Sequence, residues 1–205
     1  MESRRIEALA DGIFAIAMTV LVLQVHVPEL PEPVTGAAMI EAFDLILPTA
    51  AGFAVSFLLL GTLWYGHHQQ FRYIRRVDRA LVWSNIFLLL FVAFVPFATA
   101  FLARYPFQPV PMLVYGGTLV LAGLFLFAHW GHAVSHGLVT EEVTPELAEV
   151  VRERISMGVA VYLGATFVGA FLPKVGLLLF ACVPVLYLLP TRIDPALIEE
   201  ASEDS

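Results

Sequence analysis

The chain has 205 residues, of which 59% are hydrophobic and 14% are charged, and its formal net charge is -7. A soluble globular domain is about half apolar and a quarter charged, so this composition excludes an ordinary soluble protein and indicates a membrane protein. No sustained basic stretch is present, which argues against nucleic-acid binding, and the single cysteine, Cys182, excludes an intrachain disulfide.

The apolar segments predict the fold class. A helix that spans a bilayer needs about 20 mostly apolar residues, and proline-rich or polar connectors separate segments of that kind along the chain. The sequence therefore predicts an all-α, polytopic membrane protein with one domain, 1–190, of six transmembrane helices, followed by an acidic cytoplasmic tail, 191–205. The helices are predicted at about 6–26, 43–66, 80–103, 112–136, 154–172 and 174–190.

Basic residues predict the orientation. With the N-terminus inside, the outer side carries only Arg104 and Lys174, and the remaining nine Lys and Arg residues are cytoplasmic. Both termini are then cytoplasmic, and the expected location is the cell membrane. Asp11 interrupts the apolar stretch that a signal peptide would need, so we expect the first helix to be retained.

Asp11 is the most informative residue of the first helix. Charge at membrane depth is costly, so this carboxylate belongs either to the cytoplasmic interface or to a buried polar network. The predicted topology puts several donors at its depth: Arg5, Trp64, Asn85 and either His67 or His68. Spacing favours neither histidine strongly; we choose His68 because it lies one helical turn from Trp64.

An aliphatic stripe runs along the same helix. At 100° per residue, Ile16, Val20 and Leu23 fall within about 60° of arc, Thr19 lies at the edge of that arc, and Asp11 projects from the opposite face. Such a stripe usually faces lipid or packs inside a bundle. It can also line a pore, and the residues alone leave these alternatives open.

Two ordered blocks of residues carry a family resemblance. The first holds Arg5, Asp11, Phe14-Ala15-Ile16-Ala17, Thr19 and Leu21-Val22-Leu23; the second holds Trp64, His67-His68, Phe71, Arg76-Val77-Asp78-Arg79, Leu81, Trp83, Asn85 and Pro96-Phe97. This pattern resembles the TMEM175 family of potassium channels in its short, six-helix prokaryotic form. The family has Phe-Ser-Asp where this chain has Leu9-Ala10-Asp11, so one serine hydroxyl of the implied network is missing.

The resemblance implies a homotetrameric channel in the lipid bilayer with K+ as the permeant ion, and neither an enzyme nor a cofactor-binding protein. It implies that the first helix of each subunit lines the pore, with a hydrophobic constriction at Ile16, Val20 and Leu23 and a contribution of Thr19 to K+ selectivity. The residues implied to hold the cytoplasmic end of that helix are Arg5, Asp11, Trp64, His68 and Asn85.

Two other functions stay open on the sequence. Asp11 with His68 could make the channel proton-conducting or proton-modulated, because histidine changes its charge near neutral pH. His129, His132 and His136 share one face of the fourth predicted helix and could bind a transition metal, which would make the chain a metal-binding membrane protein. An interfacial structural role is the favoured interpretation of these three histidines.

Overall fold

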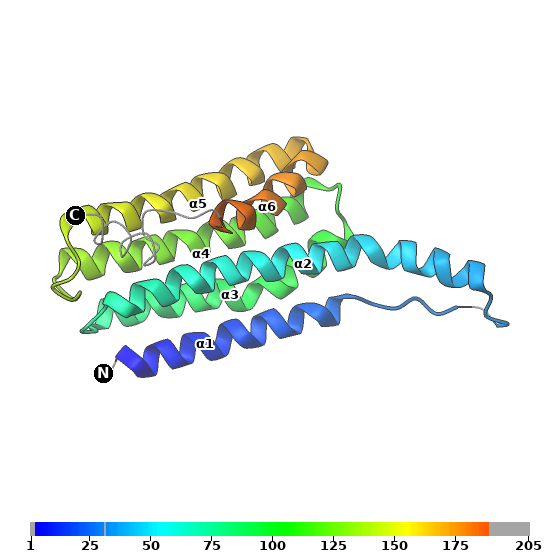
Figure 1. Ribbon diagram of the computed structural model, residues 1–205. Coiled ribbons are helices and arrows are strands. Elements are labelled where there is room, and N and C mark those ends of the chain that lie inside the picture. Colours follow the sequence, from blue (N-terminus) through cyan, green and yellow to red (C-terminus); the bar gives the residue numbers. More distant parts are fainter. Residues whose placement is uncertain (1–2, 31, 189–205) are drawn as a thin grey trace, which may run out of the picture.

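The computed structural model of the chain describes residues 3–30 and 32–188, and it is all-α, as predicted. A short 3-10 helix, η1 (Leu21–Gln24), continues α1, and α1 with η1 and the four helices that follow are each long and apolar enough to cross a membrane. The predicted tail 191–205 and the end of the sixth predicted helix lie outside the described residues. The helices are α1 (Ser3–Val20), α2 (Gly36–Tyr73), α3 (Arg79–Arg104), α4 (Pro109–Ser135), α5 (Pro145–Phe171) and the shorter α6 (Pro173–Leu188) (Figure 1).

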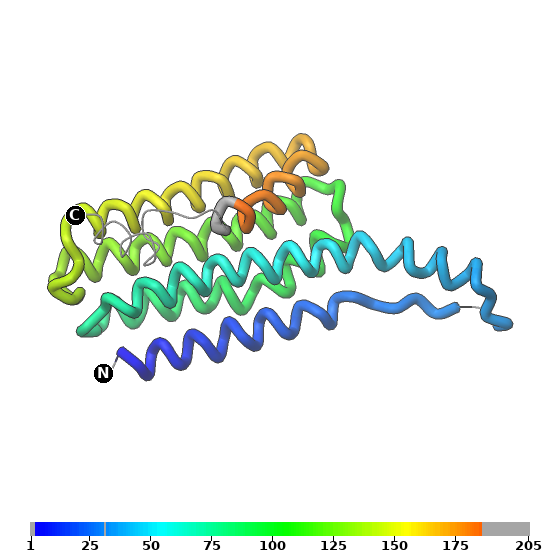
Figure 2. Tube along the Cα trace, viewed as in Figure 1, coloured from blue at the N-terminus to red at the C-terminus, as the bar shows by residue number. Residues whose placement is uncertain are grey.

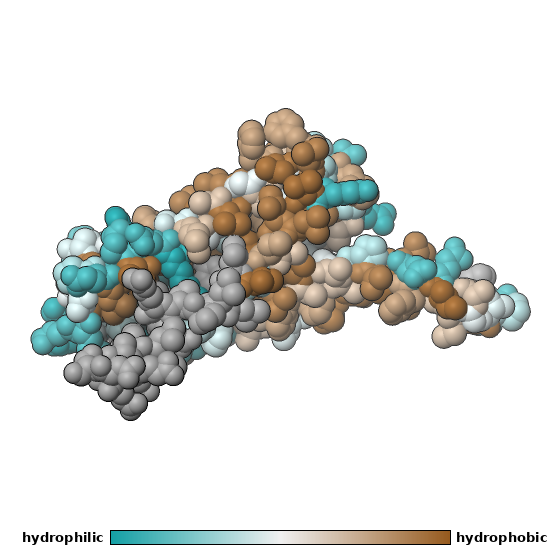
Figure 3. All heavy atoms as spheres, turned by 45° about the horizontal axis from the view of Figure 1, so that its top comes forward, coloured by the Kyte–Doolittle hydropathy of each residue, from teal (hydrophilic) through white to brown (hydrophobic). Residues whose placement is uncertain are grey.

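The surface has the pattern of a membrane protein. Figure 3 shows hydrophobic residues over the middle of the bundle and hydrophilic residues gathered toward its ends. Large side chains that a soluble protein would bury are exposed along the helices, such as Leu90 of α3 and Phe167 of α5. A lipid environment accommodates these side chains without the cost that water would impose.

Helix α2 is much longer than the predicted segment 43–66. Its 38 residues correspond to about 57 Å at about 1.5 Å per residue, roughly twice the thickness of a hydrocarbon core. Thr35 caps its start by accepting a hydrogen bond from the Ala38 amide at 3.2 Å. Its first turns extend past the end of the bundle (Figures 1 and 2). The other end of α2 is Tyr73, seven residues beyond the predicted end at 66. The polar side chains after residue 66 were expected in a loop, but several of them have hydrogen-bond partners inside the bundle, as described below.

Helices α4, α5 and α6 pack unusually closely. A side chain at Gly116 of α4 would overlap Thr166 of α5, and one at Gly176 of α6 would overlap the backbone of Gly169 in α5. Glycine is required at these crossings because no other residue lets the backbones approach as near. These close approaches hold α4, α5 and α6 together as one tightly packed group of helices.

Helix α1 lies along one edge of the bundle, beside α2 and α3 (Figures 1 and 2). Every third or fourth residue of α1 and η1 is buried there: Ile6, Ala10, Phe14, Ala17 and Leu21. Among the described residues, no helix packs on the opposite side of α1. The fold therefore buries one face of α1 and leaves the other available.

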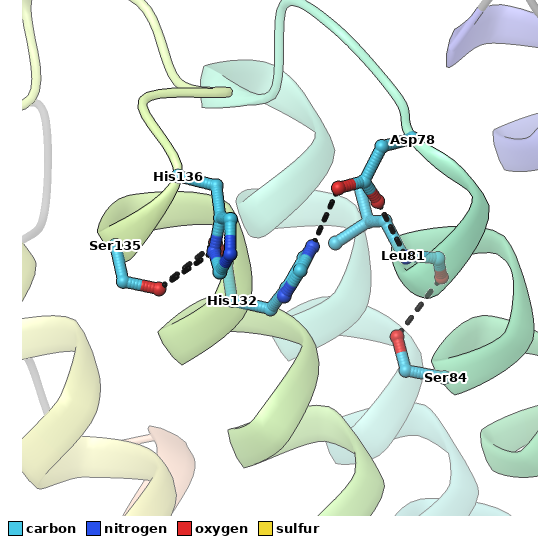
Figure 4. A network of polar contacts seen from close by, with 6 residues as sticks. All are labelled: Asp78, Leu81, Ser84, His132, Ser135 and His136. Carbon is cyan, nitrogen blue, oxygen red and sulfur yellow. Dashed lines mark hydrogen bonds and ion pairs between the residues drawn. The ribbon is translucent and has the colours of Figure 1, made fainter.

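At the end of the bundle near the N-terminus, the connector between α2 and α3 is bound to the end of α4 through Asp78, and to the connector between α4 and α5 through its backbone. The Asp78 carboxylate accepts a hydrogen bond from the Leu81 amide at 2.8 Å, which caps α3, and another from His132 Nε2 of α4 at 2.7 Å (Figure 4). Backbone bonds join the same two connectors, since the Arg75 amide donates to the Leu138 carbonyl at 2.8 Å. The hydrogen bond from Leu81, and after it the one from His132, lowers the pKa of Asp78.

We expect Asp78→Ala to lower the free energy of unfolding by about 1–2 kcal/mol, because the α3 cap is lost. The lowered pKa means that the contribution of Asp78 is present above the ordinary pKa of an aspartate and is lost as the pH falls through the lowered value. The difference in free energy of unfolding between the wild type and the variant should therefore shrink as the pH falls below about 5. Thermal unfolding in detergent across that range measures this. Glu41→Ala, which removes an exposed carboxylate of α2, is the control, and an equal effect of both variants would contradict the prediction.

Candidate functional site

The available face of α1 forms a continuous line of side chains. We call Leu9, Gly12, Ile16, Thr19 and Leu23 the open stripe; they are spaced alternately by three and four residues, the spacing at which helices of a left-handed bundle meet. Ile16 is 64% exposed and Leu23 is 68% exposed. Val20 is half-buried and lies at the border of this stripe, while Thr19 lies within it. The observed stripe is thus rotated slightly around the helix relative to the predicted one, toward Thr19 and away from Val20.

Thr19 gives the open stripe a polar group of defined direction. Its Oγ1 lies 2.9 Å from the Ala15 carbonyl oxygen and 2.9 Å from that of Ile16, so its hydroxyl hydrogen is donated back to the helix. The lone pairs of the oxygen are then available to a ligand outside the helix. The stripe therefore combines aliphatic side chains with one acceptor suited to a cation.

Two contacts hold the N-terminal half of α1 against α2. Trp64 Nε1 donates a hydrogen bond to Asp11 Oδ1 at 2.8 Å. His68, one turn further along α2, stacks on the Trp64 ring with centroids 5.6 Å apart, and its Nδ1 lies 3.3 Å from Glu7 Oε1, a contact that becomes an ion pair when the imidazole is protonated. Both carboxylates of this half of α1 thus face the same turn of α2.

The neighbouring face of α2 holds α3 and α4. His67 is fully buried, and its Nε2 donates to Asn85 Oδ1 of α3 at 2.8 Å. Gln70, one turn on, accepts from His129 Nδ1 of α4 at 2.8 Å and donates to the Leu126 carbonyl at 3.1 Å. We call residues 64–70 the polar turn of α2. From it, hydrogen bonds reach three other helices.

The predicted network is thus brought together in part. Asp11 with Trp64, and Asn85 with a histidine, are joined, but the histidine on Asn85 is His67 and not His68. Arg5 is exposed and has no ion-pair or hydrogen-bond partner among the described residues. Ala10, at the position of the missing serine hydroxyl, is fully buried and packs as an apolar residue.

Sequence reasoning missed Glu7. This glutamate lies four residues before Asp11, hence on the same face of α1, and that spacing could have identified it as a second acid directed at α2. Its Oε1 lies 3.3 Å from His68 Nδ1, so His67 and His68 each contact a neighbouring helix.

The three histidines of α4 do not converge. His129 points inward to Gln70, His132 contacts Asp78, and His136 stacks on His132 with ring centroids 4.0 Å apart (Figure 4). In the described parts of the chain, no group of three or more His, Cys, Asp or Glu side chains is arranged to hold a metal ion. Each of the three histidines has its own structural partner, and His129 is fully buried, so the interfacial role expected for all three does not apply to His129.

Comparison with known proteins gives the family. The model of the family described as endosomal/lysosomal potassium channel TMEM175 matches residues 5–96. A potassium channel of Streptomyces collinus is 38% identical over 177 residues, covering 82% of this chain and 84% of that protein. The human endosomal/lysosomal proton channel TMEM175 is 29% identical over 166 residues, covering 77% of this chain and 32% of the human protein.

The fold agrees with a solved structure. The crystal structure of a lysosomal potassium-selective channel TMEM175 homolog from Chamaesiphon minutus superposes with a TM-score of 0.75 at 29% identity, covering 90% of this chain and 97% of the other. Six-helix architecture, long matches to relatives along most of the chain and the family model over its first half all agree. This chain belongs to the TMEM175 family of ion channels.

Proposed function

We propose that this chain is a potassium-permeable channel, a homotetramer in which α1 of each subunit lines a central pore. The observation that carries the proposal is the open stripe. Burial and hydrogen bonds fix α1 on one side, and its other side is a regular line of residues that no other described part of the chain covers. Four copies meeting along this stripe would cover it. The potassium channels among its relatives support K+ as the permeant ion.

Ile16 and Leu23 are the proposed hydrophobic constriction, with Val20 at its border. A ring of aliphatic side chains excludes hydrated ions when it is narrow, because it offers nothing in place of lost water, and so acts as a gate. Such a ring passes K+ more readily than Na+, since the larger ion holds its water less tightly. Four Thr19 oxygens would replace part of that water, which assists selectivity.

In this proposal the polar turn of α2 holds the N-terminal half of α1 in place. The proposed orientation has both termini in the cytoplasm, as the distribution of Lys and Arg predicts. The polar turn then lies on the cytoplasmic side of the constriction, and its role is to support the pore helix without contacting the permeating ion.

Cation flux into liposomes tests the proposed function. Purified protein is placed in liposomes with K+ inside and Na+ outside, and then under the reverse gradient. We expect faster flux of K+ than of Na+, and no flux in liposomes without protein. Folded, oligomeric protein that carries neither ion would argue against a conducting channel.

Ile16→Ala should increase the current and reduce the preference for K+ over Na+, because the constriction becomes wider. Leu90→Ala is a matched control, since Leu90 is an exposed aliphatic residue of α3, away from the open stripe. Recordings from planar bilayers measure both quantities. If Ile16→Ala behaves like Leu90→Ala, Ile16 is not the gate.

Trp64→Phe removes the hydrogen bond to Asp11 and keeps an aromatic ring in place. A hydrogen bond to a carboxylate contributes about 1.5–3 kcal/mol, so we expect destabilisation of roughly that size and a weaker oligomer. Trp83→Phe, at an exposed tryptophan of α3, should have little effect. Thermal unfolding and size-exclusion chromatography of both variants measure the difference. Equal stability of the two variants would show that the Asp11–Trp64 hydrogen bond does not stabilise the position of α1.

Proton modulation is a second candidate function. It is favoured by the contact of His68 with Glu7 beside the Asp11–Trp64 bond, and by the proton channels among the vertebrate relatives. Protonation of His68 would strengthen its pairing with Glu7 and so tighten α1 against α2. We expect His68→Gln to flatten the dependence of the current on pH between about 5 and 8. Unchanged pH dependence in this variant would exclude His68 as the sensor.

A further inference from the structure

A cavity of about 320 Å³ lies between α2, α3, α4 and α6, at the end of the bundle remote from the polar turn. Its volume falls in the range of small-molecule sites, about 300–1,000 Å³. α1 contributes nothing to its wall, so the cavity is separate from the open stripe. Most of the lining is apolar, and it includes Pro48, Val55, Leu102, Phe107, Leu177 and Phe180.

The inner part of the cavity holds hydroxyl groups that are occupied with one another. Thr99 Oγ1 donates to Ser56 Oγ at 3.0 Å, and Ser56 Oγ lies 2.9 Å from the Tyr115 hydroxyl. All three side chains are buried. These two hydrogen bonds use two of the three hydroxyl hydrogens within the group, and the rest of the lining is mainly methyl, methylene and ring carbon.

Two basic residues, Lys174 and Arg104, are close to lining residues of the cavity, one in space and one in the sequence. Lys174, near the start of α6, places its Nζ 6.0 Å from the centre of the Phe107 ring, and Phe107 lines the cavity. Lys174 lies one turn before Leu177, which also lines it. Arg104 ends α3 directly after the lining residue Ala103. Neither cation has a carboxylate partner among the described residues.

We propose that this cavity holds one acyl chain of an anionic phospholipid, whose phosphate lies near Lys174 and Arg104. Bilayer interior and cavity are equally apolar, so hydrophobic transfer does not drive entry of the chain. An acyl chain in the cavity makes dispersion contacts with the lining side chains, and these contacts hold it there. The two cations select the headgroup, because an anionic lipid gains about 1 kcal/mol for each nearby basic residue, which corresponds to about fivefold in binding.

Photocrosslinking tests the proposal on the full chain. The protein is reconstituted in phosphatidylcholine liposomes that contain a minor fraction of phosphatidylglycerol with a diazirine in its acyl chain, and labelled peptides are mapped after illumination. We expect labels on segments 48–56, 102–107 and 177–180. Phosphatidylcholine with the same diazirine chain should label these segments at least about fivefold less.

Variants separate the acyl chain from the headgroup. Ala103→Phe fills the cavity and should abolish the labels on these segments for either lipid. Lys174→Gln should lower labelling by phosphatidylglycerol about fivefold and leave that by phosphatidylcholine unchanged. Arg79→Gln, which removes an exposed cation at the opposite end of α3, is the matched control and should change neither.

Three results would overturn the proposal. The first is equal labelling of the lining by the two phospholipids. The second is persistence of the labels in Ala103→Phe protein whose thermal unfolding matches the wild type. The third is loss of the phosphatidylglycerol label on adding an equal amount of a free fatty acid with the same chain, which would assign the site to fatty acids. None of these readouts depends on ion conduction, so the outcome is independent of the proposed channel function.

Discussion

The structure depends on the hydrogen bonds that side chains of residues 64–70 in α2 make with the neighbouring helices. Trp64 and His68 face α1, whereas His67 and Gln70 face α3 and α4. A polar side chain buried in a bundle costs free energy unless it is paired, and here each pairing also fixes where a neighbouring helix lies. The polar turn is therefore the point from which the relative positions of α1, α3 and α4 are set. It also explains why α2 continues as a helix through residues whose polarity suggests a connector.

The open stripe is a consequence of the same arrangement. Once Asp11 and Glu7 are directed at α2, the geometry of a helix turns Ile16, Thr19 and Leu23 to the other side. The supporting bonds lie on a different face from the proposed pore-lining residues. In the proposed channel, substitution in the stripe would therefore change permeation with little effect on the junction, whereas substitution in the junction would act first on stability.

Much of the fold could be predicted from the sequence, because length and hydropathy identify membrane helices without knowledge of their neighbours. The site was harder. His67 and His68 differ by 100° around α2, and choosing the partner of Asn85 requires knowing on which side of α2 the helix α3 lies. The same limit applies to Val20: the helical wheel places it with Ile16, but the buried set Phe14, Ala17 and Leu21 turns α1 so that Val20 is half-buried. Glu7 was missed because a glutamate near a helix start looks like a solvated residue until its partner is placed.

The glycine crossings of α4, α5 and α6 have a mechanical consequence. Gly116 against Thr166, and Gly169 against Gly176, leave no room for one helix to slide past another without collision. α1, in contrast, contacts the other described helices along one face and takes no part in these crossings. A displacement of α1 relative to α2 and α3 therefore leaves these glycine crossings intact. The Asp11–Trp64 hydrogen bond is one of the contacts that such a displacement would have to break.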